Sequence, residues 1–235
     1  MIHFKNAAIT LCALALLPVS TSLYASGVVP ETSVVIIEQG DGEGSINIKN
    51  TDTWPVLLLT TIENLPDDED SLLTVTPPAA RVEPGKTQHV RFMMTAQEPL
   101  KVERLKRAIF EGVPPQVKGK NEVRMTVRQN LPLLIRPAGL ERDMAPWKKL
   151  EWHVANDGLS VSNPSPYVVR LGQAVQTLPD NTTWMLPGTY VLPGQTLTLT
   201  NEGGAHVAGS AKEVRISPAT TWGYTVNSYD AALAR

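Results

Sequence analysis

Turn-forming residues divide this chain into short segments, and their spacing constrains the fold more than any other feature. From Val28 onward, runs of β-branched and apolar residues end at Pro, Gly or Asn, at intervals of about 8 to 12 residues. The runs that we expect to be strands are 33–37, 45–49, 54–62, 72–76, 89–94, 104–110, 123–135, 150–154, 159–162, 167–175, 183–186, 196–200, 214–217 and 221–227. This pattern predicts an all-β protein made of two sandwiches in tandem.

Two segments within this pattern invite a more specific interpretation. The run Val56-Leu57-Leu58-Leu59 is continuously apolar, which predicts a strand that is buried on both faces. The acidic stretch 66–70 has the composition of a calcium loop but lacks the spaced ligands and the turn glycine of a known calcium motif. We therefore expect a solvated loop there.

The first 25 residues have the pattern of a secretory signal peptide. Lys5 gives the positive start, residues 7–17 form a short apolar run that Pro18 ends, and 23–25 is an acceptable cleavage site. A membrane anchor is the alternative, but a spanning helix needs about 20 apolar residues. The run is about half that length, so we expect an exported protein whose signal is removed.

Cysteine usage and charge narrow the class of protein further. Cys12 is the single cysteine of the 235 residues and lies in the expected signal, so no disulfide would staple the mature chain. The formal net charge of −2 gives no reason to expect nucleic-acid binding. Roughly 210 remaining residues suit two domains, each held by its own apolar core.

Catalytic and metal-binding motifs are missing from the sequence. The histidines His3, His89, His153 and His206 are far from one another, and no zinc-protease, P-loop, nucleophile-elbow or dinucleotide-binding pattern occurs. We expect no enzyme activity, no cofactor, no metal and no small-molecule substrate. The sequence leaves open whether the fold brings two carboxylates together as an acid–base pair.

Three local patterns identify a family. Each combines prolines with a strand at a fixed place in one half of the chain, and they cover 76–93, then 107–137, and then 162–167 with 185–188 and 226–229. In this order and spacing they resemble the periplasmic chaperones of the chaperone–usher pilus pathway. The resemblance runs from about Val34 to Tyr229, which is nearly the whole mature chain.

The resemblance implies both an architecture and a function. It implies two tandem immunoglobulin-like β-sandwich domains in a boomerang arrangement, with the signal at 1–25, an N-terminal chaperone domain at 26–141 and a C-terminal domain at 142–235. Such chaperones act in the periplasm, where they bind, fold and cap pilus subunits by donor-strand complementation and deliver them to an outer-membrane usher. A subunit in this pathway lacks its last strand, and the chaperone fills the gap with a strand of its own.

The longest alternating run supplies the expected donor strand. Val123, Met125 and Val127 share one face because strand side chains alternate, and Leu131 resumes that face after a polar residue. The resemblance implies that this face enters the subunit. The alternative is an ordinary strand whose apolar face packs in its own core.

A second implied site binds the terminal carboxylate of the subunit. The better-known branch of the family uses a basic residue on the first strand and another in the cleft, but Ser33 or a neighbour stands at the first place here and Pro132 at the second. In this respect the chain resembles the divergent archaic branch, where basic residues on the last two strands of the first domain take over. Arg107 and Arg128 are the candidates.

Each arginine also has a structural interpretation. Arg107 could form a salt bridge with Glu111 or Glu83, and Arg128 could be a solvated strand residue. Arg136, which precedes Pro137, resembles the arginine that stabilises the hinge between the domains, so we expect a structural role for it.

Two other classes of protein share this type of fold. A fimbrial subunit or adhesin is the first alternative, but such proteins usually have one domain, an alternating N-terminal extension and often a disulfide. A carbohydrate-binding module is the second, with aromatic rings that stack on sugars. Its candidates are the five tryptophans, at 54, 147, 152, 184 and 222.

Overall fold

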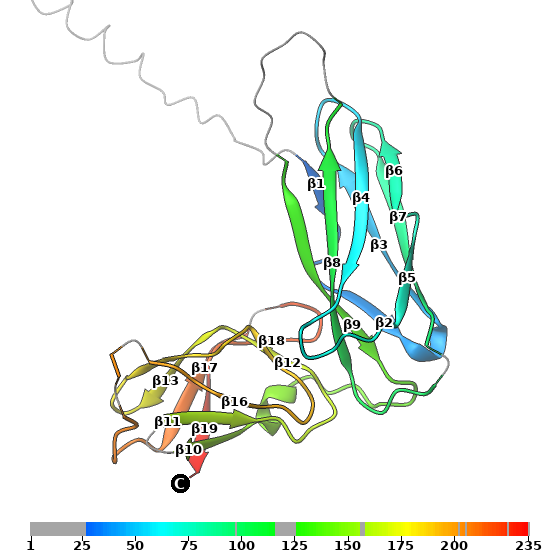
Figure 1. Ribbon diagram of the computed structural model, residues 1–235. Coiled ribbons are helices and arrows are strands. Elements are labelled where there is room, and N and C mark those ends of the chain that lie inside the picture. The colour runs from blue at the N-terminus through cyan, green and yellow to red at the C-terminus, as the bar shows by residue number, and fades with distance from the viewer. Residues whose placement is uncertain are drawn as a thin grey trace, which may run out of the picture.

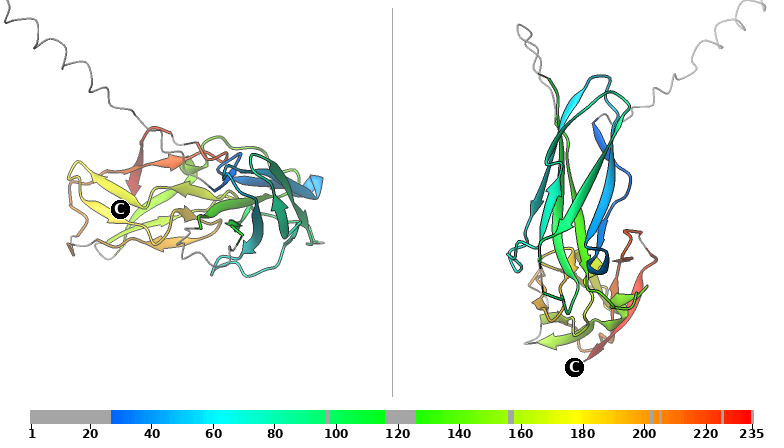
Figure 2. Two further views of the ribbon diagram at one scale, coloured as in Figure 1. Left: turned by 90° about the horizontal axis from the view of Figure 1, so that it is seen from above. Right: turned by 90° about the vertical axis from the view of Figure 1, so that its right-hand side faces the viewer.

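The chain forms two β-sandwich domains that meet at an angle (Figure 1). The computed structural model describes residues 27–96, 98–115, 126–155, 158–201, 203–204, 206–224 and 226–234. The expected signal at 1–25 lies outside them. The all-β architecture predicted from the sequence is confirmed. The last described strand lies at the side of the C-terminal domain that faces away from the N-terminal domain (Figure 2).

Nine strands of the N-terminal domain join in one hydrogen-bonded sheet. They are β1 (Val28–Pro30), β2 (Val35–Glu38), β3 (Glu43–Asn50), β4 (Val56–Glu63), β5 (Leu73–Thr76), β6 (Ala79–Val82), β7 (Thr87–Met94), β8 (Arg104–Val113) and β9 (Arg128–Arg136), with the 3-10 turn η1 (Gln39–Asp41) after β2. Their order is β5-β7-β3-β2-β9-β8-β4-β6, and β1 pairs with β3. The core contains Phe92 and Phe110, whose rings pack edge to face with 6.4 Å between their centroids.

The first two strands change partner within this domain. β1 pairs antiparallel with β3, whereas β2 pairs parallel with the end of β9, from Val35 opposite Leu133 to Glu38 opposite Arg136. The chain therefore crosses between the two layers at 31–34. As a consequence, the first part of β9 has no β2 residue beside it.

The C-terminal domain has a seven-stranded and a three-stranded sheet. Its elements are η2 (Pro146–Lys149), β10 (Glu151–Ala155), β11 (Gly158–Ser162), β12 (Val169–Leu171), β13 (Ala174–Leu178), β14 (Thr183–Met185), β15 (Tyr190–Val191), β16 (Thr196–Thr198), β17 (Glu213–Ile216), β18 (Pro218–Ala219) and β19 (Tyr229–Ala234). The core contains Trp147, Trp152 and Trp184, each at most 7% exposed. These three rings are therefore not free to stack on sugars.

Three sequence-based expectations are wrong in detail. The run Val56–Leu59 is not buried on both faces, because Val56 and Leu58 face the core while Leu57 is 44% exposed. The expected strand at 167–175 is two strands, β12 and β13, separated at Gly172. The expected strand at 221–227 begins as a turn, with Gly223 at a φ of 85°. A positive φ of this size interrupts a strand.

The acidic stretch 66–70 also differs from the solvated loop that we expected. Asp68 is 7% exposed and accepts hydrogen bonds from Arg104 and Lys106, the latter at 2.7 Å from Nζ to Oδ1. Lys106 is itself 1% exposed on the inner face of β8. This loop therefore closes one end of the N-terminal sandwich with a buried ion pair, which sequence composition did not reveal.

The two domains touch through an apolar cluster and a buried carboxylate. Leu105, Leu134 and Val168 are each at most 5% exposed and belong to one cluster that spans the domain boundary. Beside it, the Val168 backbone N–H donates to Glu103 Oε2 at 2.9 Å. The angle between the domains is thus fixed by contacts on both sides of the boundary.

Candidate functional site: a free strand edge and the cleft where it ends

The first half of β9 has a hydrogen-bonded neighbour on one side only. Its residues pair with β8 from Arg128, opposite Glu111, to Ile135, opposite Arg104. On the other side β2 begins only at Leu133. Within the described residues, the edge from Arg128 to Pro132 has no strand partner on that side. Unpaired edges of this kind accept strands from other chains.

A shallow groove runs along this free edge. It is lined on one side by 30–33, where the chain crosses between the layers, and on the other by Gln129, Asn130 and Leu131. Its volume is about 440 Å³. An added strand would thus have backbone groups of β9 on one side and the crossing segment on the other.

The predicted donor residues fall into three groups. Val123 and Met125 lie outside the described residues. Val127, directly before β9, is 45% exposed. Gly27 approaches it, since a Cβ built on Gly27 would lie 3.8 Å from the Val127 Cβ. The apolar side chain of Val127 is therefore available to a partner.

Leu131 was predicted to lie on the donor face, but its side chain lies in the core of its own domain. It is 7% exposed and packs in the core cluster of its own domain with Leu133 and Ile135. All three have the same parity along β9 and so face the same side of the sheet. Because Leu131 already fills its own core, we leave it out of the donor face and keep the residues before it.

The free edge ends at a cleft between the domains. Beyond Pro132, β2 takes over the edge of β9, and Pro132 lines a cleft of about 400 Å³ together with Leu105 and Arg107 from the N-terminal domain. The opposite wall comes from β12, β15 and β18 of the C-terminal domain. A strand on the free edge that continued toward the C-terminal domain would enter this cleft.

Arg107 lies in the cleft and forms no ion pair with a described residue. Arg107 lies on β8, opposite Pro132 of β9. Its guanidinium donates two hydrogen bonds to Asn130, one from Nε to the side-chain oxygen and one from Nη2 to the main-chain oxygen at 2.8 Å. Neither Glu111 nor Glu83 is its partner. Burial lowers the pKa of Arg107 below its usual value, and the nearby Tyr190 and Glu63 only partly oppose that shift.

The C-terminal domain contributes Arg170 and Tyr190 to the same cleft. Sequence reasoning missed Arg170, although one signal was present: it is a lone charge within the apolar run 168–171. Burial lowers the pKa of Arg170, and the positive charge of Arg107 lowers it further. The two guanidinium groups therefore face the same space.

Arg128 is placed differently from Arg107. Its guanidinium forms a salt bridge with Glu63, and both side chains are about half exposed. Arg128 does not line the cleft. The structure thus brings one of the two predicted anchor residues to the cleft and leaves the other in a surface ion pair.

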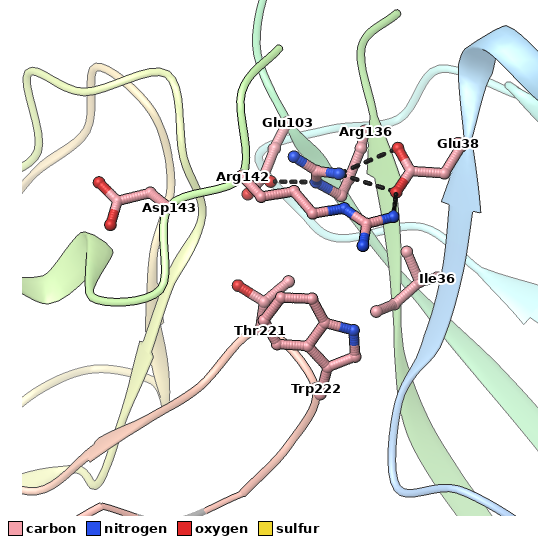
Figure 3. Close-up of a pocket in the computed structure, with 8 residues that line it drawn as sticks. All are labelled: Ile36, Glu38, Glu103, Arg136, Arg142, Asp143, Thr221 and Trp222. Carbon is pink, nitrogen blue, oxygen red and sulfur yellow. Dashed lines mark hydrogen bonds and ion pairs between the residues drawn. The ribbon is translucent and has the colours of Figure 1, made fainter. Parts of the chain in front are cut away.

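Arg136 lies at the hinge, where it is 4% exposed. Its guanidinium bonds Glu38 at 2.7 Å and Glu103 at 3.0 Å, as Figure 3 shows. Glu103 in turn accepts the Val168 N–H of the other domain. Burial raises the pKa of Glu103, although the hydrogen bonds from Val168 and Arg136 oppose that shift. Arg136 therefore orients a carboxylate that joins the two domains.

A second surface contact borders this hinge. Arg142 bonds Glu38 at 3.2 Å, and its guanidinium lies 5.9 Å from the ring centre of Trp222, a residue of the C-terminal domain (Figure 3). Together with Thr221 and Ile36 they line a cavity of about 210 Å³. The charges in it are largely paired, which distinguishes it from the cleft at Arg107.

The described residues offer no catalytic or metal-binding cluster. No three His, Cys, Asp or Glu side chains among them are grouped to hold a metal ion. His89 is hydrogen-bonded to Asn47, and His153 lies beside Glu151 on an exposed strand face. None of the helices in these residues is suited to crossing a bilayer.

Comparison with known proteins identifies the class. The profile of the pili and flagellar-assembly chaperone PapD N-terminal domain matches residues 27–141, and that of the pili assembly chaperone PapD C-terminal domain matches residues 145–228. The chain therefore belongs to the PapD-like family of periplasmic pilus-assembly chaperones, which is not enzymatic. It is a chaperone of the chaperone–usher pathway that binds pilin subunits, and not a fimbrial subunit or adhesin.

Individual relatives agree with this assignment. The chain is 44% identical over 213 residues to the uncharacterized fimbrial chaperone YhcA of Escherichia coli K12, covering 89% of this chain and 92% of that one. It is 25% identical to the chaperone protein MrkB of Klebsiella pneumoniae, covering 80% and 92%.

Solved structures agree in fold. The Pseudomonas aeruginosa CupB2 chaperone superposes with a TM-score of 0.69 at 24% identity, covering 88% of this chain and all of that one. The SafB chaperone of Salmonella enterica, solved in complex with the SafA pilin, superposes with a TM-score of 0.72 at 20% identity, covering 89% and 98%.

Proposed function

We propose that this chaperone caps a pilus subunit with the segment 123–130, which completes the unfinished sandwich of the subunit. The observation that carries the proposal is the free edge of β9, from Arg128 to Pro132, beside an open groove. Main-chain hydrogen bonds along this edge would supply affinity, and alternate side chains would supply fit. Val123, Met125 and Val127 are the proposed side chains of this contact.

The direction of the added strand follows from the position of the cleft. β9 runs from the far end of the N-terminal domain toward the C-terminal domain (Figure 1). A subunit strand that lies on the free edge and ends in the cleft must run the same way, so it pairs parallel to β9. Its last residue then stops near Pro132, where β2 already occupies the edge.

The terminal carboxylate of the subunit is the proposed ligand of Arg107. A guanidinium that is held in place by Asn130 and has no acidic partner among the described residues is suited to bind a carboxylate. The sequence also assigned Arg128 to this anchor. That role requires Arg128 to leave Glu63, and variants of the two arginines separate the possibilities.

Other parts of the proposal concern the rest of the molecule. We propose that Arg136 keeps the two domains, 26–141 and 142–235, at a fixed angle through Glu38 and Glu103. We also propose that residues 1–25 are removed on export and that the capped subunit is delivered to an outer-membrane usher. We propose that the chain belongs with the archaic branch, because Ser33 or a neighbour and Pro132 stand where the better-known branch has basic residues and because Arg128 lies four residues before Pro132.

The variant Val127→Asp tests the donor strand. An aspartate at this exposed position leaves the chaperone's own core intact, because Val127 does not belong to it. In the apolar groove of a subunit the charge would be buried without a partner, which is strongly unfavourable. Co-expression with a pilin from the same gene cluster should then yield folded, soluble chaperone without bound subunit.

Leu57→Asp is the matched control. Leu57 is 44% exposed in the same domain but lies on β4, away from the free edge, so subunit capture should stay at the wild-type level. Circular dichroism and thermal melting of the free chaperone show whether each variant is folded. Full subunit recovery with folded Val127→Asp would reject the donor assignment.

A further inference from the structure

The C-terminal domain presents a second guanidinium to the cleft that receives the end of the free edge. Arg170 is the middle residue of β12, and it pairs across the three-stranded sheet with Tyr190 of β15 and Ala219 of β18. Residues directly opposite one another on neighbouring strands share a face. That face looks into the cleft, since all three residues line it together with Arg107.

Arg170 is partly buried, and one nitrogen of its guanidinium lacks a partner within the described residues. Its Nη1 atom is buried and has no hydrogen-bond partner among the described residues. Within the described part of the chain, no carboxylate oxygen lies within 4 Å of Arg170 or Arg107, whereas most other arginines there form ion pairs. Buried charges in folded proteins are usually paired. The cleft therefore has a deficit of negative charge.

The two arginines repel one another in the free chaperone. Burial and then the charge of Arg107 lower the pKa of Arg170. Burial also lowers the pKa of Arg107, and Tyr190 and Glu63 act in the opposite direction on it. A group with negative charge between the two guanidiniums would remove the repulsion and satisfy the free donors. A carboxylate has two oxygens that accept several hydrogen bonds and so can bind both arginines at once.

We propose that Arg170 is the second cation of the carboxylate site, so that the end of the subunit is clamped between one arginine from each domain. This rests on the proposed function, in which the terminal carboxylate enters the cleft beside Arg107. Arg170 then has the role that sequence reasoning gave to Arg128. A capped subunit would hold the domains together through its own last residue, in addition to the contacts at the hinge.

A pair of peptides tests the clamp. Both reproduce the last strand of a pilin from the same gene cluster, one with a free terminal carboxylate and one with a terminal amide, and binding to the purified chaperone is measured by titration calorimetry. Wild-type chaperone should prefer the acid peptide by about 10-fold to 100-fold, because the amide loses its charge-assisted hydrogen bonds.

In Arg170→Gln this preference should shrink by at least about 10-fold, while binding of the amide peptide stays close to that of wild type. The matched control is Arg215→Gln, an exposed arginine on β17 of the same domain that is paired with Asp230. It should keep the full preference. Arg170→Gln should also melt no lower than wild type, because it removes an unpaired charge.

The outcomes distinguish the two proposals. If wild type prefers the acid peptide and Arg170→Gln keeps that preference, Arg170 is not the second anchor and the Arg107 site stands. If wild type binds both peptides equally, the carboxylate anchor itself fails, and the clamp with it. A lower melting temperature of Arg170→Gln, with the preference unchanged, would make Arg170 a structural residue.

Discussion

Two neighbouring residues of β8 carry the same charge but differ in their surroundings. Lys106 points into the N-terminal sandwich, is 1% exposed, and bonds Asp68 at 2.7 Å. Arg107 points outward into the cleft, where no described carboxylate pairs with it. Strand geometry places successive side chains on opposite faces. One strand thus supplies a cation that stabilises the fold and a cation that is left for a partner.

The two groups of charges differ in whether they are satisfied within the chain. The buried pair around Asp68 is self-sufficient, because Arg104 and Lys106 satisfy the carboxylate. The cleft has two guanidiniums and no anion among the described residues. An unsatisfied cluster in a folded domain calls for an explanation, and an incoming carboxylate provides one.

The largest effect is expected from Asp68→Asn. It leaves the buried ammonium of Lys106 without a counter-charge, and breaking such a pair destabilises a protein by about 3–5 kcal/mol. Urea unfolding, followed by tryptophan fluorescence, measures the free energy of unfolding. The control is Asp70→Asn, since the Asp70 side chain is 69% exposed and bonds Arg104 but not the buried Lys106. Its loss should stay below about 1 kcal/mol. Equal losses would contradict the contrast.

The same carboxylate predicts a pH dependence. Burial raises the pKa of Asp68, but the hydrogen bonds and charges of Arg104 and Lys106 outweigh burial and lower it overall. A lowered folded-state pKa means that the stabilisation is present above the unfolded-state pKa, near pH 4, and is lost as the pH falls further. The stability curves of wild type and Asp68→Asn should therefore converge in acid. A constant gap down to strongly acidic pH would contradict the assignment.

An intermediate effect, on binding alone, is expected from Arg107→Gln. Subunit affinity should fall by about 10-fold to 100-fold through loss of charge-assisted hydrogen bonds, whereas the free energy of unfolding should hardly change. Competition for a labelled pilin measures the first and urea unfolding the second. Arg81→Gln serves as control, since Arg81 is exposed and paired with Glu83. A large loss of stability with unchanged affinity would show that Arg107 is structural.

The smallest effect is expected from Arg128→Gln. Its pair with Glu63 is half exposed, and such pairs contribute less than about 1 kcal/mol. Both stability and subunit affinity should stay close to wild type. An affinity loss as large as that of Arg107→Gln would restore the original assignment, in which Arg107 and Arg128 share the carboxylate.

Much of the fold could be predicted because it depends on local patterns. Alternation and turn residues predicted most strands, and prolines in fixed order predicted the family. Short strands were missed where the pattern had too few residues to register, as in β15 and β18. The apolar run at 56–59 led to a wrong prediction of burial on both faces. Leu57 is exposed because its face of the sheet is not covered, and the sequence of the run does not show which face is covered.

The site was predicted less completely because it depends on pairing between distant segments. Arg107 and Arg128 look alike in sequence, but Arg128 forms an ion pair with Glu63, 65 residues away, whereas Arg107 lines the cleft. Arg170 joins Arg107 only when the domains meet, so no local motif could reveal it. Leu131 continues the alternation of the donor run, but the closure of its own core decides its role.

A crystal structure of this chaperone bound to a cognate pilin tests the central claim most directly. We expect a subunit strand that runs parallel to β9 and is hydrogen-bonded to it from Arg128 to Leu131. The terminal carboxylate of the subunit should lie within hydrogen-bonding distance of Arg107. A complex in which that edge stays unpaired, or in which the subunit's last residue lies outside the cleft, would contradict it.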